Sequence, residues 1–229
     1  MGDLWTDDYK FQTWLRVEIA VCEAQAELGY IPKEAVEDIK AKAKFNPKRI
    51  LEIEAEVRHD VIAFLTNVNE YVGDAGRYIH LGMTSSDMLD TALSLQMVDS
   101  LQVILIHVEN LIQALRYKAQ EHRYTVMIGR SHGIHAEPIT FGFKLAGWLA
   151  EMLRHRERLT ILQDRIAVGK ISGAVGTYAN VDPKIEELTC QLLGLQPDTA
   201  STQVISRDIH AEFLNALALL GASIERFAV

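Results

Sequence analysis

The sequence predicts an all-α protein built around long helices, and three observations support this. Only 5 prolines and 14 glycines occur among 229 residues. Most of them fall between long periodic segments. No Asn-Gly or Asp-Gly pair, the strongest short signal for a β-hairpin, is present. With 48% hydrophobic and 24% charged residues, the chain is also long and apolar enough to bury a substantial core.

Short helices are expected in residues 1–82, which we assign to a small N-terminal helical domain. Apolar residues recur there at three- and four-residue steps, as on the buried face of a helix. Each run is bounded by a residue typical of a helix cap or stop. The expected runs are a helix from Thr6 or Asp7 to Leu28 stopped by Gly29, a short helix after Pro32, a segment through Val57 opened by Asn46-Pro47, and residues 61–72. Residues 73–82 form the first clear break.

Three long helices are expected in residues 83–229, which we assign to an incomplete central bundle domain. Residues 84–123 contain no Gly or Pro, so one helix of about 35 residues and ~50 Å fits there. A second should run from about Pro138 to Val168, and a third from about Ser206 onward. Such helices need other long helices beside them, from the same chain or from partner subunits. Because the last segment stops without Gly, Pro or a polar tail, we expect a fragment cut inside a helix.

Charge and hydropathy argue against several classes of partner. Lys and Arg number 23 against 31 Asp and Glu, a net charge of −8, so general attraction to nucleic acid or anionic lipid is not expected. Apolar stretches are interrupted well short of the ~20 residues of a membrane span, and no signal peptide opens the chain. We therefore expect a cytoplasmic protein with no nucleic-acid or membrane partner. Cys22 and Cys190 lie in helical patterns without a Cys-x-x-Cys partner, which predicts core thiols.

The first polar break that could carry chemistry is Arg58-His59-Asp60. A fixed cation, an imidazole and a carboxylate follow one another there at a helix junction. Junctions between rigid elements are places where side chains can be presented to a ligand. The alternative is a solvated helix end with Asp60 as a cap.

The second break, residues 80–87 (HLGMTSSD), opens the first long helix. Gly82 lets the backbone turn, and the hydroxyls and free N–H groups at the helix start form a cradle for a carboxylate or phosphate. Capping and anion binding use the same groups. The alternative is therefore simple N-capping by Ser85 or Ser86.

The third break, residues 129–138 (GRSHGIHAEP), predicts an irregular loop between two long helices. His132 and His135 lie three residues apart and could ligate a metal. However, the Glu placement of His-Glu-x-x-His is missing and no third ligand is evident, so no metal is expected. A histidine held by a carboxylate could instead act as a general acid or base.

A fourth region, residues 169–180 (GKISGAVGTYAN), is small and flexible enough for a close approach of backbone to a ligand. It lacks the residue order of a P-loop. Ser201-Thr202-Gln203 then supplies polar donors and acceptors before the last helix. The alternative for both is a connecting loop.

Together these segments resemble the adenylosuccinate lyases of the fumarase/aspartase superfamily of helical homotetramers. The resemblance covers essentially the whole chain in order, and residues 132–138 (HGIHAEP) favour these enzymes over relatives with the same fold and fumarate-releasing chemistry. It implies elimination of fumarate from adenylosuccinate, giving AMP, and from succinylaminoimidazole carboxamide ribotide. It also implies a small-molecule substrate, no cofactor, and a homotetramer with active sites shared between subunits.

The resemblance also implies roles for individual residues. His132 matches the general acid, and His59 is a second catalytic candidate that would help to orient the proton donor. The hydroxyls of Thr84 and Ser85 match substrate contacts. The remaining substrate-binding positions are Arg58, His59, Asp60, His80 and Gln203.

Three departures from the family pattern matter. Ser131 stands where relatives often have Thr, which keeps the hydroxyl. The Arg-Tyr pair for the substrate phosphate is not found before Trp5, and the serine-containing mobile loop with the general base is absent. We therefore expect the isolated chain to be inactive or nearly so. The alternatives are another fumarate-releasing lyase of the argininosuccinate lyase type, a noncatalytic helical assembly module and, most weakly, a metal-dependent hydrolase.

Overall fold

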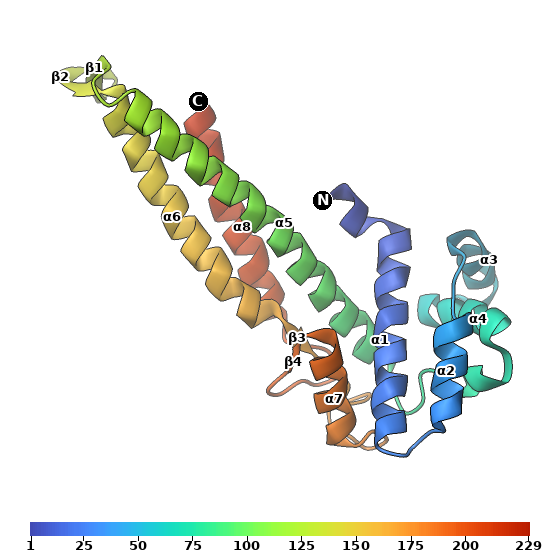
Figure 1. The fold of residues 1–229 in the computed structure, drawn as a ribbon. Coiled ribbons are helices and arrows are strands. Elements are labelled where there is room, and N and C mark those ends of the chain that lie inside the picture. Colours follow the sequence, from blue (N-terminus) through green and yellow to red (C-terminus); the bar gives the residue numbers. More distant parts are fainter. The chain divides into compact units, whose positions relative to one another are not determined.

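The computed structural model describes residues 1–229, and its chain is mainly helical, as the sequence predicts (Figure 1). The chain contains eight α-helices, two short 3₁₀ helices and four short strands. The elements are η1 (Gly2–Trp5), α1 (Asp7–Glu27), α2 (Lys33–Lys42), α3 (Pro47–Val57), α4 (Asp60–Val72), η2 (Gly73–Tyr78), α5 (Ser85–Glu121), β1 (Val126–Ser131), β2 (Ile134–Thr140), α6 (Phe141–Ile166), β3 (Val168–Gly169), α7 (Pro183–Leu193), β4 (Gln196–Pro197) and α8 (Arg207–Ala228).

The cap residues start the N-terminal helices where the sequence predicts. Thr6 Oγ1 accepts a hydrogen bond from the backbone N–H of Tyr9 at 3.3 Å at the start of α1. Asn46 Oδ1 accepts from the N–H of Lys48 at 3.0 Å at the start of α3, where Pro47 occupies the first turn. These oxygens replace acceptors that the first turn of a helix lacks. The predicted starts of both helices are confirmed.

The 129–138 segment is a β-hairpin rather than the irregular loop that the sequence predicts. β1 and β2 pair antiparallel with a bulge between Ile128 and Arg130. His132 (φ 54°) and Gly133 (φ 76°) form the two-residue turn, with the positive φ values of a type I′ turn. The search for Asn-Gly and Asp-Gly missed it because histidine also tolerates this backbone region better than most residues.

The second long helix consequently starts later than predicted. Pro138 lies in β2, and α6 begins at Phe141. Thr140 Oγ1 accepts from the N–H of Phe143 at 3.1 Å, which satisfies a donor in the first turn of α6. Proline is tolerated in β2 because each strand of a two-stranded sheet has one unpaired edge.

The sequence pattern around Cys190 is helical, and the structure bounds this helix as α7. Asp182 Oδ1 accepts from the N–H of Lys184 at 2.9 Å, and Pro183 follows the cap. Gly194 ends the helix with φ 73°, a backbone conformation that glycine adopts without a Cβ penalty. The cap, the proline and the stop are all sequence signals, and they define a helix that the sequence analysis did not delimit.

The chain divides into two compact units. Unit 1 comprises Met1–Ser100 and Ile166–Ile209, and its core lies mainly among α1, α2, α3, α4, α7 and the first turns of α5. An aromatic cluster joins α1 to α4: the rings of Phe11 and Trp14 lie 5.2 Å apart, and Phe64 stacks on Phe11 at 5.8 Å. Such rings contribute buried area and specific edge-to-face contacts.

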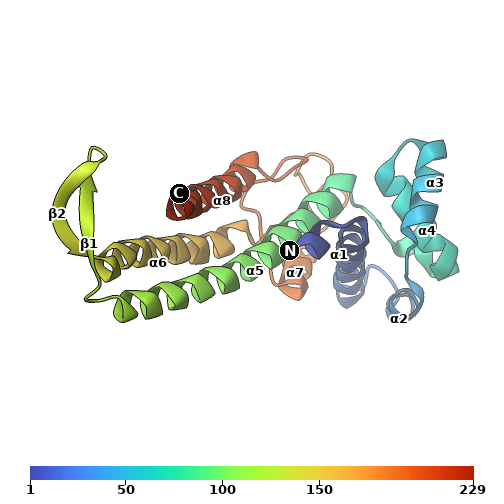
Figure 2. The ribbon, with the colours of Figure 1, turned by 90° about the horizontal axis from the view of Figure 1, so that it is seen from above.

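Unit 2 comprises Leu101–Arg165 and His210–Val229. It holds the rest of α5, the hairpin, and most of α6 and α8 (Figure 2). Arg156 Nη1 on α6 pairs with Glu109 Oε2 on α5 at 3.2 Å. His155 Nε2 on α6 lies 2.8 Å from Ser223 Oγ on α8, inside the unit. These contacts connect the three long helices within unit 2.

α5 is long and apolar enough to cross a membrane by length and composition alone, with a mean hydropathy of 1.4 over its most apolar window. Half of that window is buried inside the protein. This is weak evidence for a membrane span.

Candidate functional site

The start of α5 is capped by Asp87, not by Ser85 or Ser86 as the capping alternative assumes. Asp87 Oδ2 accepts a hydrogen bond from the backbone N–H of Thr84 at 2.9 Å, and the carboxylate is fully buried. No hydrogen bond occupies the hydroxyls of Ser85 and Ser86. Thr84 and Ser85, the predicted substrate contacts, are half-buried. They lie at the start of a helix whose first turn is fixed by the Asp87 side chain.

Lys170 anchors the same carboxylate from a distant part of the chain. Its ammonium forms an ion pair with Asp87, and neither side chain has any exposed surface. Lys170 Nζ also donates to the carbonyl of Gly173 at 2.8 Å, and Asp87 Oδ1 accepts from the N–H of Gly173 at 3.2 Å. A buried charge needs such partners, because desolvation otherwise makes it costly. The pair therefore fixes the 170–173 backbone to the first turn of α5.

Glu186 on α7 holds the other side of this segment. Its carboxylate accepts from the N–H of Ile171 and from the hydroxyl of Tyr178, each at 2.6 Å. Burial raises the pKa of Glu186, although both hydrogen bonds oppose that shift. Burial and Glu186 in turn raise the pKa of Tyr178, so the phenol stays protonated and donates. The 169–180 region is thus a connecting loop that hydrogen bonds hold at several points.

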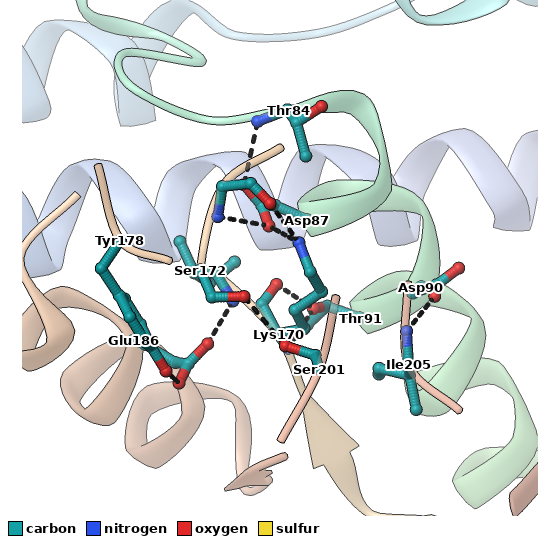
Figure 3. Close-up of polar contacts among 12 residues, drawn as sticks. Thr84, Asp87, Asp90, Thr91, Lys170, Ser172, Tyr178, Glu186, Ser201 and Ile205 are labelled. Carbon is teal, nitrogen blue, oxygen red and sulfur yellow. Dashed lines mark hydrogen bonds and ion pairs between the residues drawn. The ribbon is translucent and has the colours of Figure 1, made fainter. Parts of the chain in front are cut away.

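The polar segment before α8 is tied to the same network at two points. Ser201 Oγ lies 2.9 Å from Ser172 Oγ, and the N–H of Ile205 donates to Asp90 Oδ2 at 2.7 Å. Figure 3 shows both contacts beside the first turns of α5. Gln203 lies between these anchored residues and is exposed. Gln203 therefore lies in a segment whose neighbouring residues are anchored to the network at the start of α5.

His80 lies in the turn that precedes α5, at φ 64°. Glu18 Oε1, on α1, lies 2.6 Å from His80 Nδ1, and Glu18 Oε2 accepts from the His80 backbone N–H at 3.0 Å. Burial favours the neutral imidazole, but the hydrogen bond and charge of Glu18, with a further contribution from Asp87, outweigh it and raise the pKa of His80. His80 is therefore held close to a buried carboxylate.

The Arg58-His59-Asp60 junction is exposed, and its hydrogen bonds lie within α3 and α4. Arg58 ends α3 in the left-handed region, at φ 56°. His59, rather than Asp60, caps α4: its Nδ1 accepts from the N–H of Ile62 at 3.4 Å, while Asp60 Oδ1 accepts from the N–H of Val61 at 2.8 Å. No hydrogen bond joins this junction to His80 or to the network at α5.

His132 occupies the tip of the hairpin in unit 2. Its side chain is exposed, and its φ of 54° is a backbone conformation that non-glycine residues adopt at a cost. This φ belongs to the type I′ turn, and Arg58, His80 and Tyr178 also have positive φ, so the backbone does not single out His132. His135 follows in β2, and no third His, Cys, Asp or Glu joins the two histidines in a metal-binding group.

A hollow of about 470 Å³ lies between α1, α2 and α7, away from these residues. Glu23, Lys33 and Leu188 are among its lining residues, and none of the predicted site residues lines it. Its charged groups form surface pairs, such as Lys33 with Glu27 at 3.8 Å. The hollow therefore gives no support to the candidate site.

Sequence analysis missed Glu18, Asp90, Lys170 and Glu186. One signal was available for Glu18: it falls on the apolar stripe of α1, in step with Leu15 and Cys22, where an acidic residue is unusual. The other three occupy segments whose sequence patterns also fit surface residues. Each of them has a partner 15 or more residues away along the chain, 117 in the case of Asp90 and Arg207, so no local pattern identifies these contacts.

Comparison with known proteins identifies the family of this chain. The family model described as Lyase matches residues 1–229. The chain belongs to the Lyase family. An adenylosuccinate lyase from Synechocystis sp. is 78% identical to this Lyase-family chain over all 229 residues, and one from Bacillus subtilis is 51% identical over the same length.

Solved structures show the same fold. A crystal structure of a fumarate lyase from Mesorhizobium sp. BNC1 matches 99% of this Lyase-family chain with a TM-score of 0.94 and 32% identity. The chain covers 53% of the length of each curated relative above and 55% of that solved chain. It therefore spans about half the length of the relatives it matches.

Proposed function

We propose that the complete protein containing this chain is an adenylosuccinate lyase. It eliminates fumarate from adenylosuccinate to give AMP, and from succinylaminoimidazole carboxamide ribotide in the same purine pathway. The observation that carries the proposal is the 78% identity to the Synechocystis adenylosuccinate lyase, which extends over every residue of this chain.

The reaction sets three chemical requirements. A base removes a proton from the carbon beside a carboxylate, the C–N bond breaks as the C=C bond of fumarate forms, and an acid protonates the departing nitrogen. Donors must also stabilise the charge that accumulates on the carboxylate during proton removal. We assign the acid to His132, whose imidazole is exposed at the tip of the hairpin. The general base lies outside this chain.

The substrate-binding residues that we propose fall into two sets in unit 1. His80, Thr84, Ser85 and Gln203 lie on or beside the network at the start of α5, which supports their acting together. Arg58, His59 and Asp60 form the second set, at the α3–α4 junction, and His59 would also help to orient the proton donor. Sites shared between subunits would allow residues from separate sets and units to meet.

The assembly and location of the protein also belong to this proposal. We infer a cytoplasmic homotetramer with an N-terminal domain over residues 1–82 and a bundle domain that starts at residue 83. Exposed apolar side chains on the long helices of unit 2, including Ile106, Phe143 and Leu214, support burial against further helices in the complete assembly.

The test is turnover by the complete protein and its His132→Ala variant, followed by the absorbance change as adenylosuccinate becomes AMP. Removal of a positioned proton donor should lower kcat by roughly 10²-fold or more. The matched control is His107→Ala, which changes a histidine on α5 outside the proposed site. Turnover by His132→Ala equal to that of the wild type would exclude His132 as the acid.

A second candidate is another fumarate-releasing lyase, which the likeness to the Mesorhizobium fumarate lyase favours. Turnover of argininosuccinate but not adenylosuccinate by the complete protein would replace the first proposal with this one. A noncatalytic assembly module would show no saturable heat when fumarate and AMP are titrated into the intact oligomer.

A further inference from the structure

Three side chains of α1 hold the turn that carries His80. Glu18, Cys22 and Gln25 follow one another at four- and three-residue steps and therefore share one face of the helix. Cys22 Sγ lies 3.7 Å from the carbonyl oxygen of Tyr78, and Gln25 Nε2 donates to the carbonyl of Leu81 at 2.8 Å. The turn is thus fixed to α1 on both sides of the histidine.

Glu18 makes the central contact of this face. Its side chain is 1% exposed, and it uses one oxygen for the His80 backbone N–H and the other for Nδ1. The imidazole keeps 19% exposure, and its second nitrogen, Nε2, has no hydrogen-bond partner in the protein. One ring nitrogen is therefore committed to the fold, while the other remains as a donor for a ligand.

We propose that Glu18 is a positioning residue that holds His80 in one orientation and in its protonated form, so that Nε2–H donates to an anionic group of the substrate. This inference rests on the proposed function, because a succinyl-purine nucleotide carries both carboxylates and a phosphate. Charge-assisted hydrogen bonds of this kind are roughly twice as strong as neutral ones.

The charged and titratable groups around His80 agree with this role. Glu18 and Cys22 face it from α1, and Asp87 acts on it from α5. Burial, together with Glu18, raises the pKa of Cys22, so the thiol stays neutral. Asp87 is already paired with Lys170. Glu18 is therefore the main carboxylate that favours the imidazolium.

The test compares Glu18→Gln with the wild type in the complete protein, as kcat and KM for adenylosuccinate across pH. Gln keeps the size of the side chain but places a neutral amide beside Nδ1. His80 should then lose its proton at lower pH, so the alkaline limb of kcat/KM should move to lower pH. At a pH where the wild-type imidazole is still protonated and that of Glu18→Gln is not, the KM should be about tenfold higher in the variant, as expected for the loss of one charge-assisted hydrogen bond, while kcat changes less.

Glu27→Gln is the matched control, because Glu27 also lies on α1 but is exposed. It should leave the pH profile unchanged. If Glu18 only anchors the backbone, Glu18→Gln should lower activity by the same factor at every pH, and that result would overturn the proposal. Introducing Glu18→Gln into His80→Gln should produce no additional pH-dependent change.

A second measurement separates this proposal from the proposed function. Diethyl pyrocarbonate acylates only neutral imidazole, and peptide mass spectrometry can follow its reaction at His80 as a function of pH. In the wild type this reaction should begin at higher pH than in Glu18→Gln, whether or not adenylosuccinate is turned over. Identical profiles for the two proteins would overturn the role of Glu18. Failure of the wild type to turn over any succinyl-purine would instead overturn the proposed function. Should Glu18→Gln not fold, the wild-type profile decides: a midpoint of the acylation rate at or below the ordinary histidine pKa of 6.5 would refute the proposal.

Discussion

Lys170 and Asp87 form an ion pair whose two side chains are completely buried. Their backbone partners, Thr84 and Gly173, belong to segments more than eighty residues apart. A buried pair of this kind is weak evidence for stability by itself, since desolvation offsets much of the attraction. Here it specifies which backbone segments meet at the start of α5. The cost of a buried charge without a partner appears when only one of the two residues is replaced.

Lys170→Met should therefore destabilise the complete protein strongly. The uncompensated Asp87 carboxylate would remain buried, at a cost on the order of 3–5 kcal/mol. The measurement is the midpoint of urea unfolding, with the slope checked for constancy. Lys184→Met, on the exposed side of α7, is the matched control and should change stability by no more than about 0.5 kcal/mol. Equal midpoints for the two variants would show that the pair has no structural role.

The 169–180 segment shows how an element without regular secondary structure can be held firmly. Gly173 and Gly176 both adopt positive φ, at 81° and 79°. A Cβ at Gly173 would meet nothing within 4 Å, whereas a Cβ at Gly176 would lie 2.2 Å from the carbonyl oxygen of Ser201. A side chain at Gly173 would therefore add backbone strain alone, whereas a side chain at Gly176 would add both backbone strain and a steric clash.

Alanine substitution at each glycine tests this separation. Gly173→Ala should cost about 1–2 kcal/mol, because an L-residue is strained in the left-handed region. Gly176→Ala should cost this amount plus about 1–3 kcal/mol of overpacking, because backbone must move away from the new methyl group. Thermal unfolding of the complete protein measures both. Equal losses in the two variants would mean that the 201–205 segment adjusts freely and does not hold Gln203 in place.

At the scale of the whole molecule, the long helices of unit 2 leave several large apolar side chains exposed. Ile106 on α5 is 62% exposed, and Phe143 on α6 is 70% exposed. Long helices with apolar residues outside their own core are typical of bundles completed by partner chains. This surface bears on the homotetramer that we propose.

Ile106→Glu should weaken assembly of the complete protein. A charge placed in an apolar interface is desolvated without a partner, so the apparent mass should fall below that of four chains in sedimentation experiments at micromolar concentration. Leu51→Glu on the short helix α3 serves as the control, because Leu51 is similarly exposed, at 57%. A tetramer that is unchanged by Ile106→Glu would place the interface elsewhere.

Local chemistry explains why most helices were predictable. Thr6 and Asn46 each supply an acceptor to the helix that follows, and that signal depends only on neighbouring residues. The hairpin at His132 and Gly133 was missed because its turn uses a residue pair outside the usual set. The hydrogen bonds that hold the 169–180 segment could not be predicted, because distant carboxylates such as Asp87 and Glu186 accept them.

The amino-acid sequence by itself determined the helical class, the caps that start the helices and the motif that contains His132, because these depend on the order of nearby residues. Only the tertiary structure decided that Glu18 holds His80, that Lys170 neutralises Asp87, and that Ser201 meets Ser172. These partners are separated by 62, 83 and 29 residues along the chain. Their pairing depends on how the helices pack, because a short sequence pattern does not specify which distant residues come into contact.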